Sequence, residues 1–216
     1  MPNLNCEYAL PKGHFFNCDH GIEYNQIQFH QPKFDISNLW IHFGFREQEK
    51  FFKISNQDGL TLSLLRLLPL SILNNNYYGI SKIGTLPSYR GNGYAYQLYR
   101  CAIERLDLPI ICDASLTIPG SYNIWMKLIH ESKTDSFEIK HLDTKSEAIK
   151  DYAYKNPMPR IWGYDEDILE IIKDDKENLE DAYLDGEVSE ELYKFLKHHL
   201  NLLEDRSHVR LSANKK

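Results

Sequence analysis

The sequence predicts a mixed α/β fold arranged around one strand–loop–helix segment. Three observations lead to this prediction. Alternating apolar residues favour strands before residue 85, and apolar residues at helical spacing follow residue 94. A short, wholly apolar run at 109–112 then precedes a second helical pattern. This order of elements is typical of domains that combine a sheet with covering helices.

The composition describes a chain that can bury a sizeable core. Of its 216 residues, 42% are hydrophobic, and no run approaches the roughly 18 apolar residues of a membrane span. The segment from Met1 to Asn5 lacks the basic and apolar parts of a signal peptide, which predicts a cytoplasmic protein. Four cysteines without paired spacing are then most simply reduced thiols. They are Cys6, Cys18, Cys101 and Cys112.

The net charge of −6 is distributed unevenly along the chain. Residues 165 to 191 hold thirteen acidic residues and two lysines, which leaves 23 basic and 18 acidic residues elsewhere. A mildly basic body suits a phosphate-rich cofactor. The bias is too small to indicate nucleic acid as a partner.

The first part of the chain favours strands. Apolar residues alternate cleanly over 39–45 and less cleanly over 22–29. Residues 60–64 alternate as in a half-buried strand, after which the alternation breaks, so the strand could run into a short helical turn. Asn74-Asn75-Asn76 predicts a hairpin turn into a strand at 77–83.

The stretch from Ile83 to Ala95 is the most informative part of the sequence. Its apolar run is followed by Pro87, which marks a turn, and by small and polar residues that lead into a helix. Gly91 and Gly93 would let the backbone approach a ligand without a Cβ in the way. The first N–H groups of the helix lack intrahelical partners at the positive end of the helix dipole, so a pyrophosphate is a natural occupant. The predicted apolar side of this helix comprises Ala95, Leu98, Tyr99, Ala102 and Leu106.

The glycine pattern is not a dinucleotide fingerprint, because Tyr96 stands where a third glycine would be needed. It resembles instead the acyl-CoA loop of the GNAT acyltransferase superfamily, in the residues Arg90-Gly91-Asn92-Gly93-Tyr94-Ala95. The lead-in Leu86-Pro87-Ser88-Tyr89-Arg90-Gly91 resembles the usual lead-in of that superfamily. An ordinary strand–turn–helix, whose glycines only make the turn, is the alternative.

The elements after the helix follow the core order of the same superfamily. Residues 109–112 favour an interior strand, and a second helix follows. The segment 137–141 predicts a strand, 145–154 a short helix and 160–164 a final strand. The resemblance covers residues 77 to about 164 and implies a GNAT-like mixed, splayed central sheet flanked by helices. The apolar side of the second helix comprises Ile124, Trp125, Leu128 and Ile129.

The resemblance implies direct transfer of an acetyl group from acetyl-CoA to a small-molecule or protein amine. Backbone N–H groups near Thr85 and Leu86 would hold the pantetheine or the thioester oxygen, as an oxyanion site does. The following loop would hold the pyrophosphate. Its residues are Arg90, Gly91, Asn92, Gly93, Tyr94, Ala95 and Tyr96.

Proton transfer needs further groups. For the base that deprotonates the amine we choose Asp113, at the carboxyl end of the apolar run, although it could equally cap the next turn. In the superfamily a tyrosine protonates the leaving thiolate, but the matching position here holds Trp125, whose indole is not a useful acid. Tyr122, one turn earlier, could substitute for it or be an ordinary packed aromatic. His42 and His141 are weaker candidates for the base.

The segment after the apolar run also resembles a divergent, phage-associated subgroup of GNAT-like proteins. That subgroup carries an Asp, a Thr-Pro-Gly-Gly-like turn and an Ile-Trp-x-Lys-Leu run. The matching residues here are Asp113 to Gly120 and Ile124 to Leu128. This chain departs from the pattern at Ser121, which replaces a glycine, and at Ile118, which is inserted before the proline.

The last part of the chain changes character. Two amphipathic helical stripes are separated by Asp185-Gly186, and Ser189 can cap the second. We therefore expect an acidic helical hairpin over 165–206, packed against a domain at 1–164 or against a second copy in a homodimer. Residues 207–216 would form a flexible tail.

Three other interpretations remain open from the sequence. The chain could be a GNAT-shaped protein that has lost catalysis and acts by binding, as Trp125 and the lack of a carboxylate over 77–83 favour. The acidic helices could imitate nucleic-acid phosphate and occupy a DNA-binding partner. An enzyme acting on a nucleobase has only the slightly basic body in its support. A zinc site is not predicted, because no standard spacing links Cys6, His14, Cys18 and His20.

Overall fold

A computed structural model describes residues 21–28, 38–113, 116–118, 120–152, 163–165, 176–186, 189–190, 193–194, 197 and 208–216. The chain divides into two compact units. The first comprises residues 1–111 together with 213–216, and the second comprises residues 112–212. The boundary expected after residue 164 falls inside the second of these units and stays a prediction. No helix of the described part is long and apolar enough to cross a membrane.

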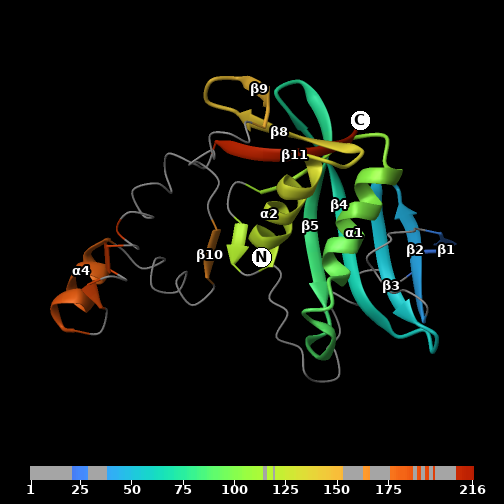
Figure 1. Cartoon of the computed structure of the whole chain (residues 1–216), viewed down its shortest axis with the longest axis horizontal. Helices are drawn as coiled ribbons and strands as arrows, with labels where there is room; N and C mark the ends of the chain where they lie inside the picture. Colours follow the sequence, from blue (N-terminus) through green and yellow to red (C-terminus); the bar gives the residue numbers. More distant parts are fainter. Residues whose placement is uncertain are drawn as a thin grey trace. The chain divides into compact units, whose positions relative to one another are not determined.

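The first unit is built on strands that are neighbours in the order of the chain (Figure 1). β1 to β5 pair antiparallel, and β6 pairs parallel with β5. The mixed sheet agrees with the predicted α/β class. The strands are β1 (Tyr24–Ile27), β2 (Leu39–Arg46), β3 (Glu49–Asn56), β4 (Thr61–Ile72), β5 (Asn75–Thr85) and β6 (Ile110–Ile111).

β4 and β5 form the long hairpin that the asparagine run predicted. The turn lies at Leu73 and Asn74, whose φ angles are 51° and 59°. β4 continues without a break through residues 64–68, so the alternative of a short helical turn there is wrong. The physical reason is burial of successive residues: Leu64 and Leu65 are both 0% exposed, and a strand buried on both faces has no polar alternation.

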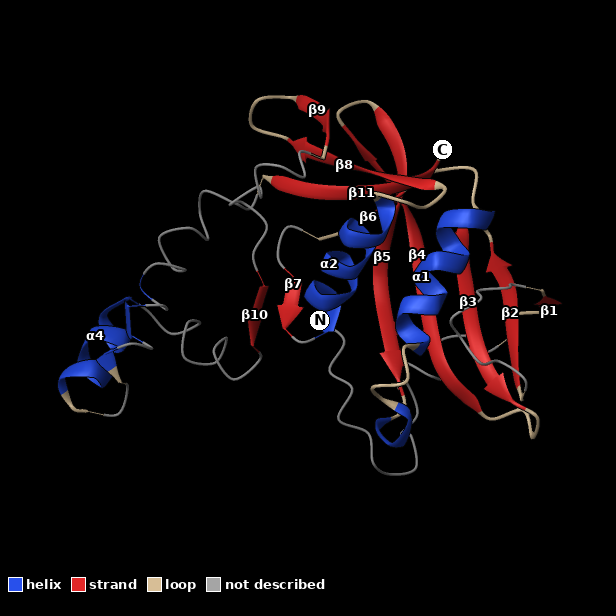
Figure 2. Ribbon diagram, in the orientation of Figure 1, coloured by secondary structure: helices blue, strands red, loops and turns tan. Residues whose placement is uncertain are grey.

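Helix α1 (Tyr94–Arg105) covers one face of β3, β4 and β5 (Figure 2). Leu98, Tyr99 and Ala102 are each 0% exposed, which confirms the apolar side predicted for this helix. A second apolar cluster contains Phe51 and Leu64, with three partly buried residues packed against it. They are Ile22, Tyr24 and Leu86.

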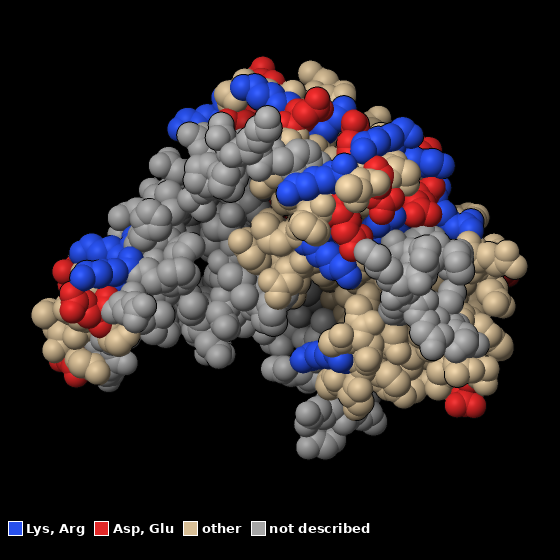
Figure 3. Space-filling view, in the orientation of Figure 1, with Lys and Arg blue, Asp and Glu red and all other residues tan. Residues whose placement is uncertain are grey.

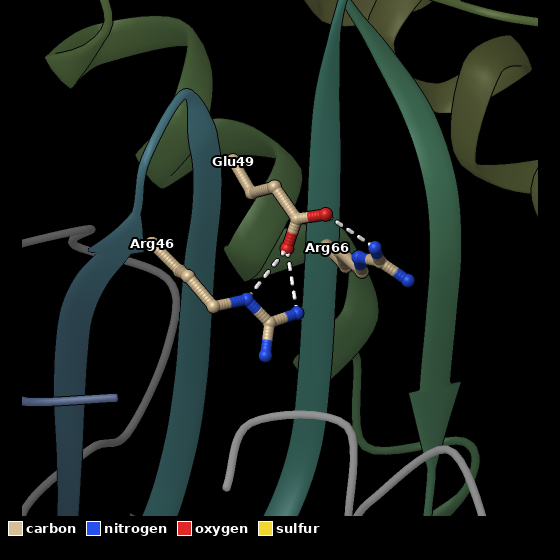
Figure 4. A network of polar contacts seen from close by, with 3 residues as sticks. All are labelled: Arg46, Glu49 and Arg66. Atoms are coloured by element: carbon tan, nitrogen blue, oxygen red, sulfur yellow. Dashed lines mark hydrogen bonds and ion pairs between the residues drawn. The ribbon is translucent and has the colours of Figure 1, made fainter. Parts of the chain in front are cut away.

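An ion-pair network joins three strands of this unit (Figure 4). Glu49 of β3 accepts hydrogen bonds from Arg46 of β2, with 2.7 Å between Nη2 and Oε2, and from Arg66 of β4. These bonds and the two positive charges hold the pKa of Glu49 below its usual range, although partial burial of the carboxyl acts in the opposite direction. The network therefore depends on an ionised Glu49.

The second unit contains strands in the order β11, β8, β9, of which β11 continues into residues of the first unit, and a separate parallel pair, β7 and β10. Helix α2 contacts β7 and β8. The apolar residues Trp125 and Leu128 of α2 are 0% exposed, as its predicted apolar side requires. The elements are β7 (Leu116–Ile118), α2 (Gly120–Ser132), β8 (Phe137–Asp143), β9 (Ala148–Asp151), β10 (Gly163–Asp165), α4 (Lys176–Leu184) and β11 (Val209–Lys215).

Two predictions for this part of the chain are wrong. The segment 145–154 contains strand β9 in place of a helix, because Asp143 Oδ1 accepts the N–H groups of Lys145 and Ser146 and turns the chain back. The expected flexible tail at 207–216 contains strand β11. Its alternate residues are buried, with Leu211 0% exposed, so burial of apolar side chains holds it in place.

Part of the acidic helical hairpin can be described. α4 leads to Gly186, whose φ is 75°, and the N–H of Tyr193 donates to the carbonyl of Ser189 at 2.8 Å. The rings of Tyr183 and Tyr193 stack with their centroids 4.3 Å apart. The antiparallel hairpin itself stays a prediction. The remainder of the predicted hairpin lies outside the described residues.

Charged side chains are interspersed on the face shown in Figure 3. Where they gather, toward the top of the view, Lys and Arg lie next to Asp and Glu, and much of the other described surface is uncharged. A nucleic-acid site is typically a stripe or patch of positive charge. The face in view carries no such stripe among the residues that the structure describes.

Candidate functional site

The end of β5 runs into a loop that is ordered by its own short-range hydrogen bonds. Pro87 begins a 3₁₀ turn, in which the N–H of Tyr89 donates to the carbonyl of Leu86 at 2.9 Å. Asn92 Nδ2 donates to the Tyr89 carbonyl at 3.1 Å. Arg90 Nε lies 3.5 Å from the Thr85 carbonyl oxygen, so that side chain folds back over the turn.

The two glycines of the loop adopt the left-handed conformation that favours glycine. The φ angles of Gly91 and Gly93 are 80° and 77°. Gly93 is the N-cap of α1 without any side-chain capping bond, and its carbonyl accepts the N–H of Gln97 at 3.0 Å. A Cβ built on Gly91 would meet no atom within 4 Å. The surface next to Gly91 is therefore open.

Four backbone N–H groups of this loop and the first helical turn have no acceptor among the described residues. They belong to Gly91, Asn92, Gly93 and Ala95. Gly91, Asn92 and Gly93 are also exposed. Donors at the positive end of a helix dipole form a favourable environment for an anion.

β5 loses its second neighbour partway along its length. β6 pairs only with Tyr78 and Gly79, and the chain then leaves the first unit after Ile111. Beyond this point, within the described part of the chain, β5 is paired with β4 alone. A bulge lies at the same level, because Arg66 pairs with Lys82 but the next residue of β4 pairs with Ile80. The ladder between β5 and β6 is therefore only two residue pairs long, and the splaying of these strands stays a prediction.

The register of β4 and β5 shows which amides face this free edge. The N–H of Leu86 donates to the carbonyl of Leu62 at 2.9 Å. Hydrogen-bonded pairs alternate along an antiparallel ladder, so the N–H groups of Ile83 and Thr85 point away from β4. Neither has an acceptor in the ranges that the structure describes. Ile83 could not be identified from the sequence, because only the register of β4 and β5 shows the direction of its backbone N–H.

The same register limits one predicted donor. Leu86 was expected to offer its backbone N–H to a thioester or pantetheine, but Leu62 already accepts that group. A ligand oxygen would have to displace this bond. Thr85, by contrast, combines an outward N–H with a hydroxyl 2.9 Å from the hydroxyl of Ser63.

The predicted catalytic residues belong to the second unit. Asp113 is an exposed residue. Desolvation by the surrounding atoms nevertheless raises the pKa of its carboxyl, and the positive charge of Arg210 opposes that rise. Tyr122 lies half-buried in α2. Trp125 is 0% exposed, so its place is in the core of that unit. The structure brings Thr85 and the loop together in the first unit, and the roles of Asp113 and Tyr122 stay predictions.

The two weaker candidates for a base are strand residues. His42 Nε2 lies 2.8 Å from Ser55 Oγ, and burial together with the charge of Lys53 lowers its pKa. His141 is 6% exposed in β8. Burial raises the pKa of the thiols of Cys101 and Cys112 to about 12, so neither thiol ionises readily.

No group of three or more His, Cys, Asp or Glu side chains that could hold a metal ion occurs in the described ranges. The four N-terminal Cys and His residues considered for zinc lie outside the described residues: Cys6, His14, Cys18 and His20.

Neither a protein-family model nor a curated protein matches this chain. Among solved structures it is similar to a protein assigned to the GNAT acetyltransferase family from Bacteroides thetaiotaomicron, with 16% identity and a TM-score of 0.28. That likeness covers 43% of this chain and 48% of the other, so it spans about half of that protein's length.

A second likeness is to a GCN5-related glucosamine N-acetyltransferase region in a fungal multi-domain GH3 beta-N-acetylglucosaminidase. The identity is 12% and the TM-score 0.31, over 75% of this chain and 20% of that one. At such TM-scores neither likeness decides what this chain does. Its function is inferred from the geometry of its own residues.

Proposed function

We propose that this chain is an N-acyltransferase that moves an acetyl group from acetyl-CoA to an amine. One observation carries the proposal, a row of backbone N–H groups from the free edge of β5 through the loop to the first turn of α1. None of these groups has an acceptor among the described residues. They belong to Ile83, Thr85, Gly91, Asn92, Gly93 and Ala95.

The two ends of this row suit two parts of the donor molecule. CoA carries amide groups along its pantetheine arm, and amides pair with the open edge of a strand. It also carries a diphosphate, which suits N–H groups at a helix N-terminus. The open surface at Gly91 leaves room for phosphate oxygens to approach the backbone.

The reaction would proceed by direct attack. The amine nitrogen bonds to the thioester carbonyl carbon, the C–S bond breaks, and the amine proton passes to a base. Asp113 is the proposed base, because its raised pKa makes the carboxylate a better proton acceptor than an ordinary aspartate. Tyr122 is proposed to protonate the departing thiolate. The acceptor would be a small-molecule or protein amine.

A binding protein of the same shape is the second candidate. Trp125, at the position where the superfamily places its tyrosine acid, is fully buried and cannot donate a proton to a thiolate. No carboxylate is present from Tyr77 to Ile83. Such a chain would bind acetyl-CoA and leave it intact, and it would act through a partner, for example at the acidic helices.

Calorimetric titration of the full chain with acetyl-CoA tests the site, with two matched variants. Gly91 and Gly59 both have positive φ, 80° and 82°, and neither has an atom within 4 Å of an added Cβ. Gly91→Leu and Gly59→Leu therefore carry the same kind of backbone strain, but only the first places bulk in the proposed site. We expect Gly91→Leu to weaken binding at least tenfold and Gly59→Leu to leave it unchanged. Failure of the wild type to bind, or equal losses in both variants, would refute the proposal.

A second measurement separates the enzyme from the binding protein. Free thiol released from acetyl-CoA is followed with a panel of small amines, peptides with free N-termini and lysine peptides. Turnover with any of them supports acetyl transfer. Binding of acetyl-CoA without turnover on the whole panel supports the binding protein instead.

A further inference from the structure

Two hydroxyl groups meet where β4 lies opposite the end of β5. Ser63 of β4 lies directly opposite Thr85 of β5. Ser63 Oγ is 2.9 Å from Thr85 Oγ1 and 2.8 Å from the carbonyl oxygen of Gly84. Ser63 is 0% exposed, whereas Thr85 is half-buried. Ser63 is therefore the buried member of the pair, and Thr85 is the partly exposed one.

The hydrogen atoms of this pair can be assigned from their partners. A carbonyl oxygen only accepts, so Ser63 must use its single proton toward Gly84. The contact between the two hydroxyls then requires Thr85 to donate its own proton to Ser63. Thr85 Oγ1 is left with lone pairs and no proton for any ligand.

We infer that Ser63 sets Thr85 as a hydrogen-bond acceptor, and that Thr85 thereby selects an amide N–H on the pantetheine arm of the acyl donor. This inference rests on the proposed function. The backbone N–H of Thr85 points to the free edge and suits a carbonyl oxygen, while its Oγ1 suits an N–H. One residue thus complements both groups that alternate along an amide-bearing chain. Ser63 acts through Thr85 and is a positioning residue.

The test uses CoA and two analogues in which one or the other pantetheine amide is replaced by an ester. The ester keeps the carbonyl but has an oxygen in place of the N–H. This oxygen cannot donate a hydrogen bond, and it would face a lone pair of Thr85 Oγ1. We expect the wild-type chain to bind one of the two esters more weakly than CoA by roughly five- to tenfold. Thr85→Val should remove this preference, and Thr85→Ser should retain it.

Ser63→Ala leaves the proton of Thr85 free to point at the ester oxygen, so the preference for the amide should shrink. Ser55→Ala is the matched control, because Ser55 is a buried serine on neighbouring β3 whose hydroxyl lies 2.8 Å from His42. That variant should keep the full preference. A purely structural role for Ser63 would weaken CoA and ester binding together and leave their ratio unchanged.

The outcomes separate the two levels of the proposal. If the wild type binds no CoA, the proposed function fails. If it binds CoA and both esters equally, the selection of an N–H by Thr85 is wrong while the proposed function stands. Equal effects of Ser63→Ala and Ser55→Ala on the ratio of the affinities would overturn the role of Ser63.

Discussion

Gly44 of β2 lies opposite Tyr24 of the neighbouring strand β1, and the two residues before β1 come close to it. A Cβ at this position would stand 2.7 Å from Ile22 Cγ2 and 2.9 Å from the backbone oxygen of Glu23. A backbone atom cannot move aside as a side chain can, so either strand would have to shift. We expect Gly44→Ala to lower the free energy of unfolding by about 1–3 kcal/mol, measured by urea denaturation.

Gly79→Ala is the control for this prediction. Its Cβ would meet Leu70 Cδ2 at 3.3 Å, and Leu70 is 43% exposed and free to rotate away. This variant should lose well under half as much stability. A loss as large as that of Gly44→Ala would show that the crowding at β1 is not the cause.

Tyr122 and Trp125 lie one turn apart on α2 but have different surroundings. Tyr122 is half-buried and Trp125 is 0% exposed. If Tyr122 is the acid, Tyr122→Phe should lower kcat by at least tenfold with little change in acetyl-CoA binding. Trp125→Phe should instead reduce stability by on the order of 1–3 kcal/mol through lost packing. Unchanged kcat in Tyr122→Phe would remove this residue from the mechanism.

If Asp113 is the base, its pKa determines how kcat/KM changes with pH on the acidic side of the profile. A base works only when deprotonated, so kcat/KM should rise with pH through the pKa of this carboxyl. Desolvation raises that pKa above the ordinary 3.8, so the rise should centre above this value. In Asp113→Asn the rate should fall and this limb should disappear. A wild-type limb that survives in the variant would assign the base elsewhere.

Among single residues, the glycines of the loop were easier to predict from the sequence than the amides at the free edge of β5. Gly91 and Gly93 could be predicted because their conformational demands are local and leave a mark in the composition. The proposed roles of Ile83 and Ser63 depend on which residue stands opposite each on the partner strand, and that depends on the register of the whole hairpin. The occupied N–H of Leu86 has the same origin.

At the scale of elements, the network of Arg46, Glu49 and Arg66 ties β2, β3 and β4 together (Figure 4). The pKa of Glu49 is lower in the folded chain than its ordinary 4.5, because hydrogen bonds from Arg66 and Arg46 together outweigh the effect of partial burial. Its contribution to stability is therefore present above about pH 4.5 and is lost as the pH falls through the lowered value.

We expect Glu49→Gln to cost about 1 kcal/mol at pH 7 and progressively less as the pH falls below 4.5. Urea denaturation at a series of pH values measures this difference. Glu190→Gln is the control, since Glu190 pairs with Lys194 at an exposed site that joins no strands. If the difference between wild type and Glu49→Gln does not change with pH, the ionised carboxyl is not the source of the stability.

The elements that the sequence predicted correctly have strong local patterns. The β4–β5 hairpin has its asparagine turn, and α1 has apolar residues at helical spacing. β9 was misassigned because the turn set by Asp143 outweighs the helical composition of the segment. β11 was missed because a short strand near charged residues shows a weak alternation, and only its distant neighbours bury it.

At the scale of the molecule, the end of the chain has a structural role. Leu211 and Ala213 of β11 are both 0% exposed, and they fall on the two sides of the division between the units. Leu211→Ala should cost about 2–5 kcal/mol of unfolding free energy. Lys215→Ala, at an exposed position of the same strand, should stay within about 0.5 kcal/mol of the wild type. Equal stability of the two variants would mean that β11 adds little to the fold.

The first unit draws on both ends of the sequence, because residues 213–216 complete it. A nascent chain emerges from the ribosome in order, and domains commonly fold as they emerge. Here the segment that carries the loop has left the exit tunnel long before its final strand residues are made. A chain cut before residue 213 would therefore keep Gly91 and Gly93 but lack four residues of the first unit, among them the buried Ala213.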